Sequence, residues 1–150
     1  LNMKSYVISA WLVLLSTTAC LQDVNCAYTQ LMSAVNKNDA DLVKHLLANG
    51  ADAKATNYYG RTALMLAAQY GYDELVELLL PMSDAKATTN GNYYGMTALM
   101  YAALGANDKS VELLLPKSDA KAVDNYELTA LDYAKSRGNN QIIELLQQYN

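Results

Sequence analysis

The sequence contains no phenylalanine, one histidine, one tryptophan, two prolines and two cysteines. Both cysteines, Cys20 and Cys26, lie in or beside the N-terminal segment. The rest of the chain can therefore assemble neither a cysteine-histidine nucleophile pair nor a zinc site with cysteine ligands. The histidine, His45, stands where related segments of the chain carry leucine, and we expect it to be a partly covered packing residue.

A basic stripe and a glycine-rich phosphate loop are also missing. The net charge is −4 and the lysines are scattered, so binding to nucleic acid has little electrostatic support. The carboxylates Asp73, Glu74, Asp108 and Glu112 are expected on the solvated faces and first turns of helices, where they suit the helix dipole. We therefore expect no enzyme, no cofactor and no metal, with an unrecognised hydrolase as the rival interpretation.

The N-terminal segment has the composition of a secretory signal peptide. Met3 and Lys4 are followed by an apolar run over residues 7–15 and then by small neutral residues. The run is shorter than the roughly 20 apolar residues that cross a bilayer. We assign residues 1–27 to a leader and short tether, and a buried helix over residues 6–15 is the alternative.

Cys20 directly follows a Thr-Thr-Ala sequence that resembles a bacterial lipobox, with Thr17 where leucine is usual. Two outcomes stay open. Cys20 is either lipidated, which anchors the protein to a membrane, or the leader is removed and the protein is exported in soluble form, where Cys20 and Cys26 could pair. The expected location is the periplasm, the outer membrane as a lipoprotein, or the medium after secretion.

A repeated phrase organises the rest of the chain. Residues 58–68 read YYGRTALMLAA, and residues 93–103 read YYGMTALMYAA. Each copy leads to the same apolar ending, VELLL, at residues 76–80 and 111–115. Weaker copies begin around Thr29 and Thr129, so the unit recurs about every 33 residues.

Each unit predicts a turn followed by two helices. Gly60 and Gly95 stand where a tight turn needs positive φ, and a threonine two residues later can cap the first helix. Alanine pairs such as Ala67 and Ala68 keep one face of that helix slim, which lets neighbouring helices approach closely.

The second helix carries an apolar stripe that one unit cannot bury alone. In the second copy the stripe consists of Leu75, Val76, Leu79 and Leu80. Because proline cannot continue a helix, Pro81 and Pro116 predict that the second helices end near Leu80 and Leu115.

This pattern resembles the ankyrin repeat. The resemblance implies an all-α ankyrin repeat solenoid with short hairpin loops, formed by one domain over residues 28–150. Its helix-turn-helix repeats, about four in number, lie at residues 28–57, 58–92, 93–124 and 125–150.

Two departures from the family pattern, Thr-Pro-Leu-His, carry expectations of their own. The histidine position holds Met32, Met65, Met100 and Asp132, and the proline position holds Gln30, Ala63, Ala98 and Ala130. We expect the histidine hydrogen-bond network to be absent and stacking to depend on apolar burial. In the last copy Glu127 replaces the turn glycine, as is common in terminal repeats.

The aromatic usage points to a binding surface, since twelve residues are tyrosine. Tyrosine offers an apolar ring and a polar tip at little entropic cost, and it is enriched at binding hot spots. The resemblance implies that the turns and first helices form a concave, tyrosine-rich recognition face. The candidate partner-binding residues are Tyr58, Tyr59, Arg61, Gln69, Tyr70, Tyr93, Tyr94, Met96, Leu104, Asn125, Tyr126, Leu128, Ser136 and Arg137.

An alternative is that the turn tyrosines pack against one another and only shield the first helices. Tyr101 and Tyr133 occupy the position of Leu66 and are expected in the core. We expect a monomeric, non-catalytic protein-protein interaction module that acts in the cell envelope or outside the cytoplasm on an unidentified protein partner. The alternatives are an immunity or inhibitor protein that neutralises a toxic enzyme, a secreted effector that binds a host protein, and a stabiliser of an envelope enzyme.

Overall fold

The computed structural model describes residues 24–89 and 94–149, which form four consecutive pairs of helices. In chain order the elements are α2 (Val24–Asn36) and α3 (Ala40–Ala48), α4 (Ala63–Tyr70) and α5 (Asp73–Leu79), α6 (Ala98–Gly105) and α7 (Asp108–Leu114) with the short 3-10 helix η1 (Leu115–Lys117), and α8 (Ala130–Arg137) and α9 (Asn140–Gln148). In the described ranges the only β pairing is an isolated antiparallel bridge between Thr88 and Thr97.

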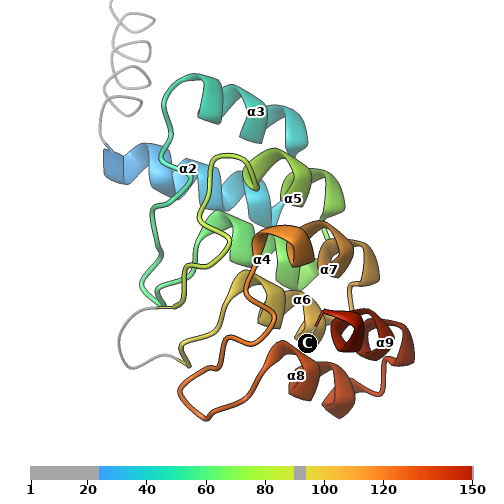
Figure 1. The fold of residues 1–150 in the computed structure, drawn as a ribbon. Coiled ribbons are helices and arrows are strands. Elements are labelled where there is room, and N and C mark those ends of the chain that lie inside the picture. The colour runs from blue at the N-terminus through green and yellow to red at the C-terminus, as the bar shows by residue number, and fades with distance from the viewer. Residues whose placement is uncertain (1–23, 90–93, 150) are drawn as a thin grey trace, which may run out of the picture.

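The pairs stack in sequence order into two rows. The first helices, α2, α4, α6 and α8, form one row, and the second helices, α3, α5, α7 and α9, form the other (Figure 1). The loops that lead from one pair to the next project on the same side of the stack (Figure 1). This arrangement is the all-α solenoid that the repeats predict.

Threonine caps begin the first helices of the last three pairs, as expected. The hydroxyls of Thr62, Thr97 and Thr129 each accept a hydrogen bond at 3.3 Å from the backbone N–H three residues on. These contacts satisfy amide groups that have no partner within the helix.

The residues at the family's histidine position complete the caps. The sulfur atoms of Met65 and Met100 lie 3.4 Å from the backbone nitrogens of Thr62 and Thr97, which donate to them. In the last pair a carboxylate oxygen of Asp132 accepts the equivalent hydrogen bond at 2.9 Å. The methionines are therefore capping acceptors as well as buried core residues, a role that apolar burial alone does not predict.

The helix ends also follow the predictions. Gly60 and Gly95 have φ of 70° and 69°, and Glu127 adopts φ of 61° at the equivalent position. The chain leaves α5 after Leu79, directly before Leu80 and Pro81. At the next repeat α7 ends at Leu114, and Pro116 lies within η1. Proline lacks the N–H that would extend the α-helix, which explains both ends.

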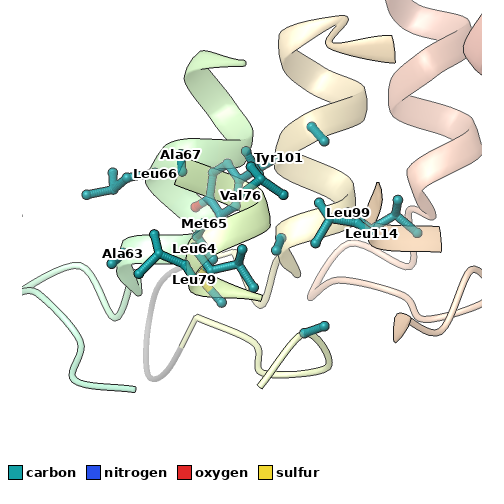
Figure 2. Close-up of a cluster of buried hydrophobic side chains, with 14 of the residues drawn as sticks. Ala63, Leu64, Met65, Leu66, Ala67, Val76, Leu79, Leu99, Tyr101 and Leu114 are labelled. Carbon is teal, nitrogen blue, oxygen red and sulfur yellow. The ribbon is translucent and has the colours of Figure 1, made fainter. Parts of the chain in front are cut away.

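The core runs continuously between the two rows of helices. Residues of α4, including Leu64 and Ala67, are fully buried, and Leu79 of α5 and Leu114 of α7 join the same cluster (Figure 2). The small alanines let successive first helices approach closely, whereas the leucines fill the space toward the second row. Each pair thus buries apolar surface that only its neighbours can cover.

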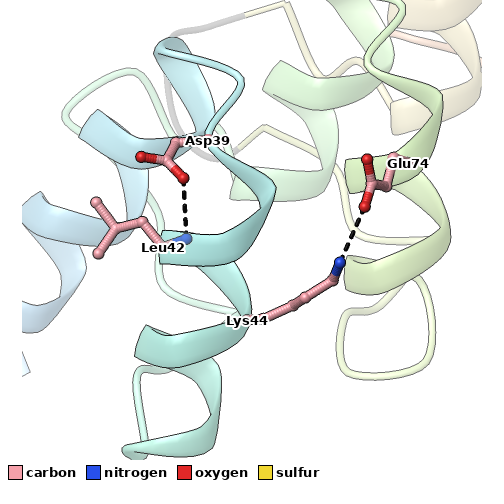
Figure 3. Close-up of polar contacts among 4 residues, drawn as sticks. All are labelled: Asp39, Leu42, Lys44 and Glu74. Carbon is pink, nitrogen blue, oxygen red and sulfur yellow. Dashed lines mark hydrogen bonds and ion pairs between the residues drawn. The ribbon is translucent and has the colours of Figure 1, made fainter.

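Polar contacts join neighbouring second helices at their surface. Lys44 of α3 forms an ion pair with Glu74 of α5 at 2.9 Å (Figure 3). Nearby, at the start of α3, the Asp39 carboxylate caps the helix by accepting from the Leu42 N–H at 3.0 Å (Figure 3). The ion pair raises the pKa of Lys44. Because both side chains are well exposed, this pair contributes little to stability.

The first repeat differs from the others at its first helix, and the expected leader falls outside the described part. The helix α2 spans Val24–Asn36, so Thr29 lies inside a helix and not at its start. Residues 1–23 of the expected leader, with Cys20 among them, lie outside the described residues. Among the residues that the structure describes, no helix is long and apolar enough to cross a membrane.

His45 is exposed rather than partly covered. Its ring Nε2 lies 3.3 Å from the side-chain nitrogen of Asn49, and the same amide group donates to the His45 carbonyl at 2.7 Å. The first repeat lies at one end of the described stack, so no preceding described helix covers this position (Figure 1). A polar side chain therefore suits a site that leucine occupies in the other repeats.

Candidate functional site

The turn before α4 is held by one asparagine. The Asn57 side-chain oxygen accepts hydrogen bonds from the backbone N–H groups of Tyr59 at 2.9 Å and Arg61 at 3.0 Å. The Gly60 N–H donates to the Asn57 carbonyl at 2.8 Å, and positive φ at Gly60 completes the turn. This local network fixes the backbone from which Tyr58, Tyr59 and Arg61 project.

Asp124 holds the turn before α8 in the same way. One carboxylate oxygen accepts from the backbone N–H groups of Tyr126 at 2.8 Å and Leu128 at 3.0 Å. The other accepts from the Tyr133 hydroxyl at 2.5 Å. Burial, together with this carboxylate, raises the pKa of Tyr133 well above its ordinary value of 10.0. Tyr133 is therefore a neutral hydrogen-bond donor at physiological pH.

The middle turn is tied to both its own repeat and the next. The Thr89 hydroxyl accepts from the Met96 N–H at 3.0 Å, and the Thr89 N–H donates to the Met96 carbonyl at 3.1 Å. The Asn125 N–H donates to the Tyr94 carbonyl at 2.9 Å and thereby links neighbouring turns. This bond couples the turn before α6 to the turn before α8.

Four of the predicted turn tyrosines are exposed. The exposed fractions are 86% for Tyr58, 52% for Tyr59, 52% for Tyr94 and 64% for Tyr126. The rings form two pairs, with centroids 5.6 Å apart for Tyr58 and Tyr59 and 5.8 Å apart for Tyr94 and Tyr126. Tyr93 lies outside the described residues. The tyrosines pack partly on one another, as the alternative interpretation expected, yet most of their surface stays open.

Arg61 lies at the centre of this surface. Its guanidinium carbon is 5.1 Å from the ring centroid of Tyr101 and 5.8 Å from that of Tyr59. One terminal nitrogen, Nη1, donates to the Gln69 side-chain oxygen at 3.1 Å. Burial raises the pKa of Tyr101, and the positive charge of Arg61 opposes that shift. The guanidinium is thus half-buried between two aromatic rings.

Two adjoining hollows open around Arg61. The first, about 230 Å³, is lined by Tyr59, Arg61, Tyr94 and Tyr101. The second, about 300 Å³, shares the last three of these residues and is also bordered by Gln69, Met96, Leu104 and Tyr133. We call the surface that these eight residues line the tyrosine face. It spans α4, α6 and α8 and the turns that precede α4 and α6.

Some of the predicted partner-binding residues line the two hollows, and the others lie elsewhere. Six predicted residues line the hollows, namely Tyr59, Arg61, Gln69, Tyr94, Met96 and Leu104. Met96 is only 4% exposed, so it is a floor residue and not the exposed turn residue that we expected. Its N–H and carbonyl bond to Thr89, which draws its segment inward.

The other predicted residues lie beyond the hollows. Tyr70 is half exposed and pairs with Tyr72, with ring centroids 5.6 Å apart. Those that border neither hollow and remain exposed are Tyr58, Asn125, Tyr126, Leu128, Ser136 and Arg137.

Tyr101 and Tyr133 belong to the site although we predicted them in the core. Tyr101 is 3% exposed, so the core prediction is correct for most of its surface, yet its ring borders both hollows. Tyr133 is half-buried and borders the second. The sequence held one sign of this role. At the position that Leu66 occupies in its repeat, the next two repeats carry tyrosine, whose hydroxyl needs a polar partner or solvent.

Two carboxylates predicted on solvated surface connect repeats instead. Asp73 accepts from the Ser110 hydroxyl at 2.7 Å, and Asp108 accepts from the Asn139 side-chain amide at 2.7 Å. Both are half-buried at the starts of second helices. Throughout residues 24–89 and 94–149, no three histidine, cysteine or acidic side chains come together in a way that could hold a metal ion.

Paired helices, stacked in two rows with capped turns on one side, define a helical repeat protein. A sequence profile of the family described as "Ankyrin repeats (3 copies)" matches residues 10–90, 31–124 and 81–150. The chain belongs to the ankyrin repeat family. Its repeats form a protein-protein interaction module, a type of fold that is generally non-catalytic.

Two curated plant proteins match a short part of the chain. The E3 ubiquitin-protein ligase XBAT33 of Arabidopsis thaliana is 49% identical over 47 residues, and the probable E3 ubiquitin-protein ligase XBOS33 of Oryza sativa subsp. japonica is 47% identical over 47 residues. Each match covers 31% of this chain and 9% of the relative. The chain spans less than a tenth of either relative, so the ligase activity in their names carries no argument here.

Proposed function

We propose that this ankyrin repeat protein acts outside the cytoplasm by binding a protein partner through the tyrosine face, without catalysis and as a monomer. The observation that carries the proposal is the pair of adjoining hollows around Arg61, walled by Tyr59, Tyr94 and Tyr101. Aromatic and arginine side chains in a hollowed surface are the usual anchors of protein interfaces. Hydrogen bonds within the turns restrain the backbone that carries those anchors, and restraint before binding lowers the entropic cost of association.

Partner capture tests the face. The chain would be immobilised and incubated with the envelope fraction of the source cell, beside a Tyr59→Ala/Tyr94→Ala variant. The matched control is Tyr149→Ala, because Tyr149 is also about half exposed but follows α9 on the other row of helices. We expect a protein retained by the wild type and the control but lost by the double variant. Equal retention by all three chains would contradict the proposal.

The double variant must stay folded for this comparison to count. Both replaced side chains are about half exposed, so cooperative thermal unfolding should persist. If the variant instead lost its cooperative transition, the turn tyrosines would be structural, as the alternative interpretation holds.

Export is proposed from the sequence of the leader, in which Lys4, the apolar run over residues 7–15 and Cys20 follow one another. The test is expression of the chain and a Cys20→Ser variant in a Gram-negative bacterium, followed by cell fractionation and detergent phase partition. A lipoprotein would enter the detergent phase only with Cys20 present. Soluble export would place both chains in the aqueous periplasmic fraction, and retention of both in the cytoplasm would contradict export.

A further inference from the structure

We infer that the first hollow of the tyrosine face binds an acidic side chain, aspartate or glutamate, from an extended segment of the partner protein. This inference rests on the proposed function and names the chemistry of the partner at that site. Arg61 is the residue that carries it.

The positive charge of Arg61 has no acidic partner in the described chain. Within the described residues, 24–89 and 94–149, the ion pairs are Lys44 with Glu74 and Lys109 with Glu112. Arg61 instead donates from Nη1 to the neutral amide oxygen of Gln69 and is also hydrogen-bonded to the neutral side chain of Tyr101. A guanidinium has five N–H donors, so the group retains donor capacity toward the hollow that it lines.

The carboxylate of Asp124, which contacts the face through Tyr133, is already hydrogen-bonded. It is 5% exposed and accepts hydrogen bonds from two backbone N–H groups and from the Tyr133 hydroxyl. Asp132 likewise accepts from the backbone and hydroxyl of Thr129. The acidic groups beside this part of the face therefore serve their own turns and caps, and the charge of Arg61 is left for a ligand.

The surroundings strengthen a charge interaction at this point. The rings of Tyr59 and Tyr101 lie against the guanidinium and shield it from water. A partly desolvated arginine binds carboxylate through two parallel hydrogen bonds, and these bonds are stronger than they would be in open solvent. The side chains of Tyr59 and Tyr94 border the same hollow, so a bound carboxylate would lie beside aromatic rings as well as the guanidinium.

The second hollow indicates which kind of side chain lies next to the acidic residue in the partner segment. Met96 and Leu104 give it an apolar border, and it shares Arg61, Tyr94 and Tyr101 with the first hollow. A segment that places a carboxylate against Arg61 can therefore place a nearby apolar side chain in the second hollow. Because the chain carries a net charge of −4, a strongly acidic run would be repelled at long range, and a single acidic residue fits better.

The test is a selection of random dodecapeptides displayed on phage against the full chain. We expect the enriched peptides to share one aspartate or glutamate beside an apolar residue. Changing that acid to its amide should weaken binding by at least about tenfold, as should Arg61→Gln, because either change removes one member of a partly desolvated charge pair. Combining both changes should lose little more than either alone, since they act on one contact.

Two further variants sharpen the measurement. Arg61→Lys keeps the charge but lacks the planar fork, so its binding should fall between those of the wild type and Arg61→Gln. Lys117→Gln removes an exposed cation on η1, far along the chain from the face, and should leave binding unchanged. Circular dichroism of each variant would confirm that the helices remain intact.

The other outcomes separate failure of this inference from failure of the proposed face. Peptides that lose binding on Tyr94→Ala but not on the acid-to-amide change would overturn the acidic anchor and leave the face intact. Peptides indifferent to both Tyr94→Ala and Arg61→Gln would count against the face itself. A selection that enriches no peptide would overturn the extended acidic segment as the ligand.

Discussion

Asn107 closes the end of a helix in the preceding repeat. Its side-chain nitrogen donates to the carbonyl oxygens of Ala68 at 2.7 Å and Gln69 at 2.9 Å, near the C-terminus of α4. Those carbonyls belong to the last turn of the helix, where backbone acceptors lack partners within the helix. A residue at the start of α7 thus satisfies the end of α4 and couples two repeats.

Replacing Asn107 with alanine should destabilise the protein by about 1–3 kcal/mol, because the Gln69 carbonyl would lose its donor and the Ala68 carbonyl would keep only the 3.4 Å bond from the Gly71 N–H. Urea unfolding followed by circular dichroism measures the change. Asn140→Ala is the matched control, since Asn140 is an exposed residue in the first turn of α9. Equal stability of the two variants would show that Asn107 does not couple the repeats.

Gly105→Ala should be destabilising even though alanine favours helices. A Cβ at Gly105 would lie 2.4 Å from both the Asn107 side-chain nitrogen and the Gln69 carbonyl oxygen. Overpacking of this kind typically costs about 1–3 kcal/mol. The midpoint of urea unfolding reports it, and a midpoint at or above that of the wild type would contradict the crowding argument.

Ala106→Gly should stabilise the chain. Ala106 has φ of 57°, and the equivalent residues Gly71 and Gly138 have φ of 69° and 68°. The left-handed conformation costs a residue with a Cβ roughly 1–2 kcal/mol, which glycine avoids, although its greater freedom in the unfolded chain offsets part of the gain. A higher thermal midpoint than that of the wild type is the expected result, and a lower one would count against it.

The acid sensitivity of the last repeat should depend on Asp132. Hydrogen bonds from the hydroxyl and backbone of Thr129 hold the pKa of Asp132 below its ordinary value of 3.8. The ionised carboxylate therefore stabilises the folded state above that value, and the contribution is lost as pH falls through the lowered pKa.

The free energy of unfolding measured from pH 7 down to pH 2 should consequently fall less steeply for Asp132→Asn than for the wild type. Asp119→Asn is a control, because Asp119 is exposed and lies in the loop before α8. The same slope in wild type and Asp132→Asn would rule out a linkage at this cap.

Local features of the fold were predictable because a few adjacent residues set them. Positive φ at Gly60 and Gly95 and the cap at Thr62 follow from backbone sterics and from one hydroxyl within reach of an N–H. The first repeat shows the limit of such reasoning. There Thr29 marks the repeat frame, yet it lies inside α2 and not at the start of a helix.

The repeat period, the turn-helix-helix order, the buried stripe and the clustering of tyrosines in the turns can all be read from the residues, because each is encoded within one repeat. Contacts between side chains of different repeats depend instead on how the helices stack. Arg61 and Tyr101 come from different repeats and lie together because α4 and α6 stack side by side. The hollow at Arg61 and the bond from Asn107 to Ala68 likewise depend on how neighbouring helices approach, which no single repeat specifies.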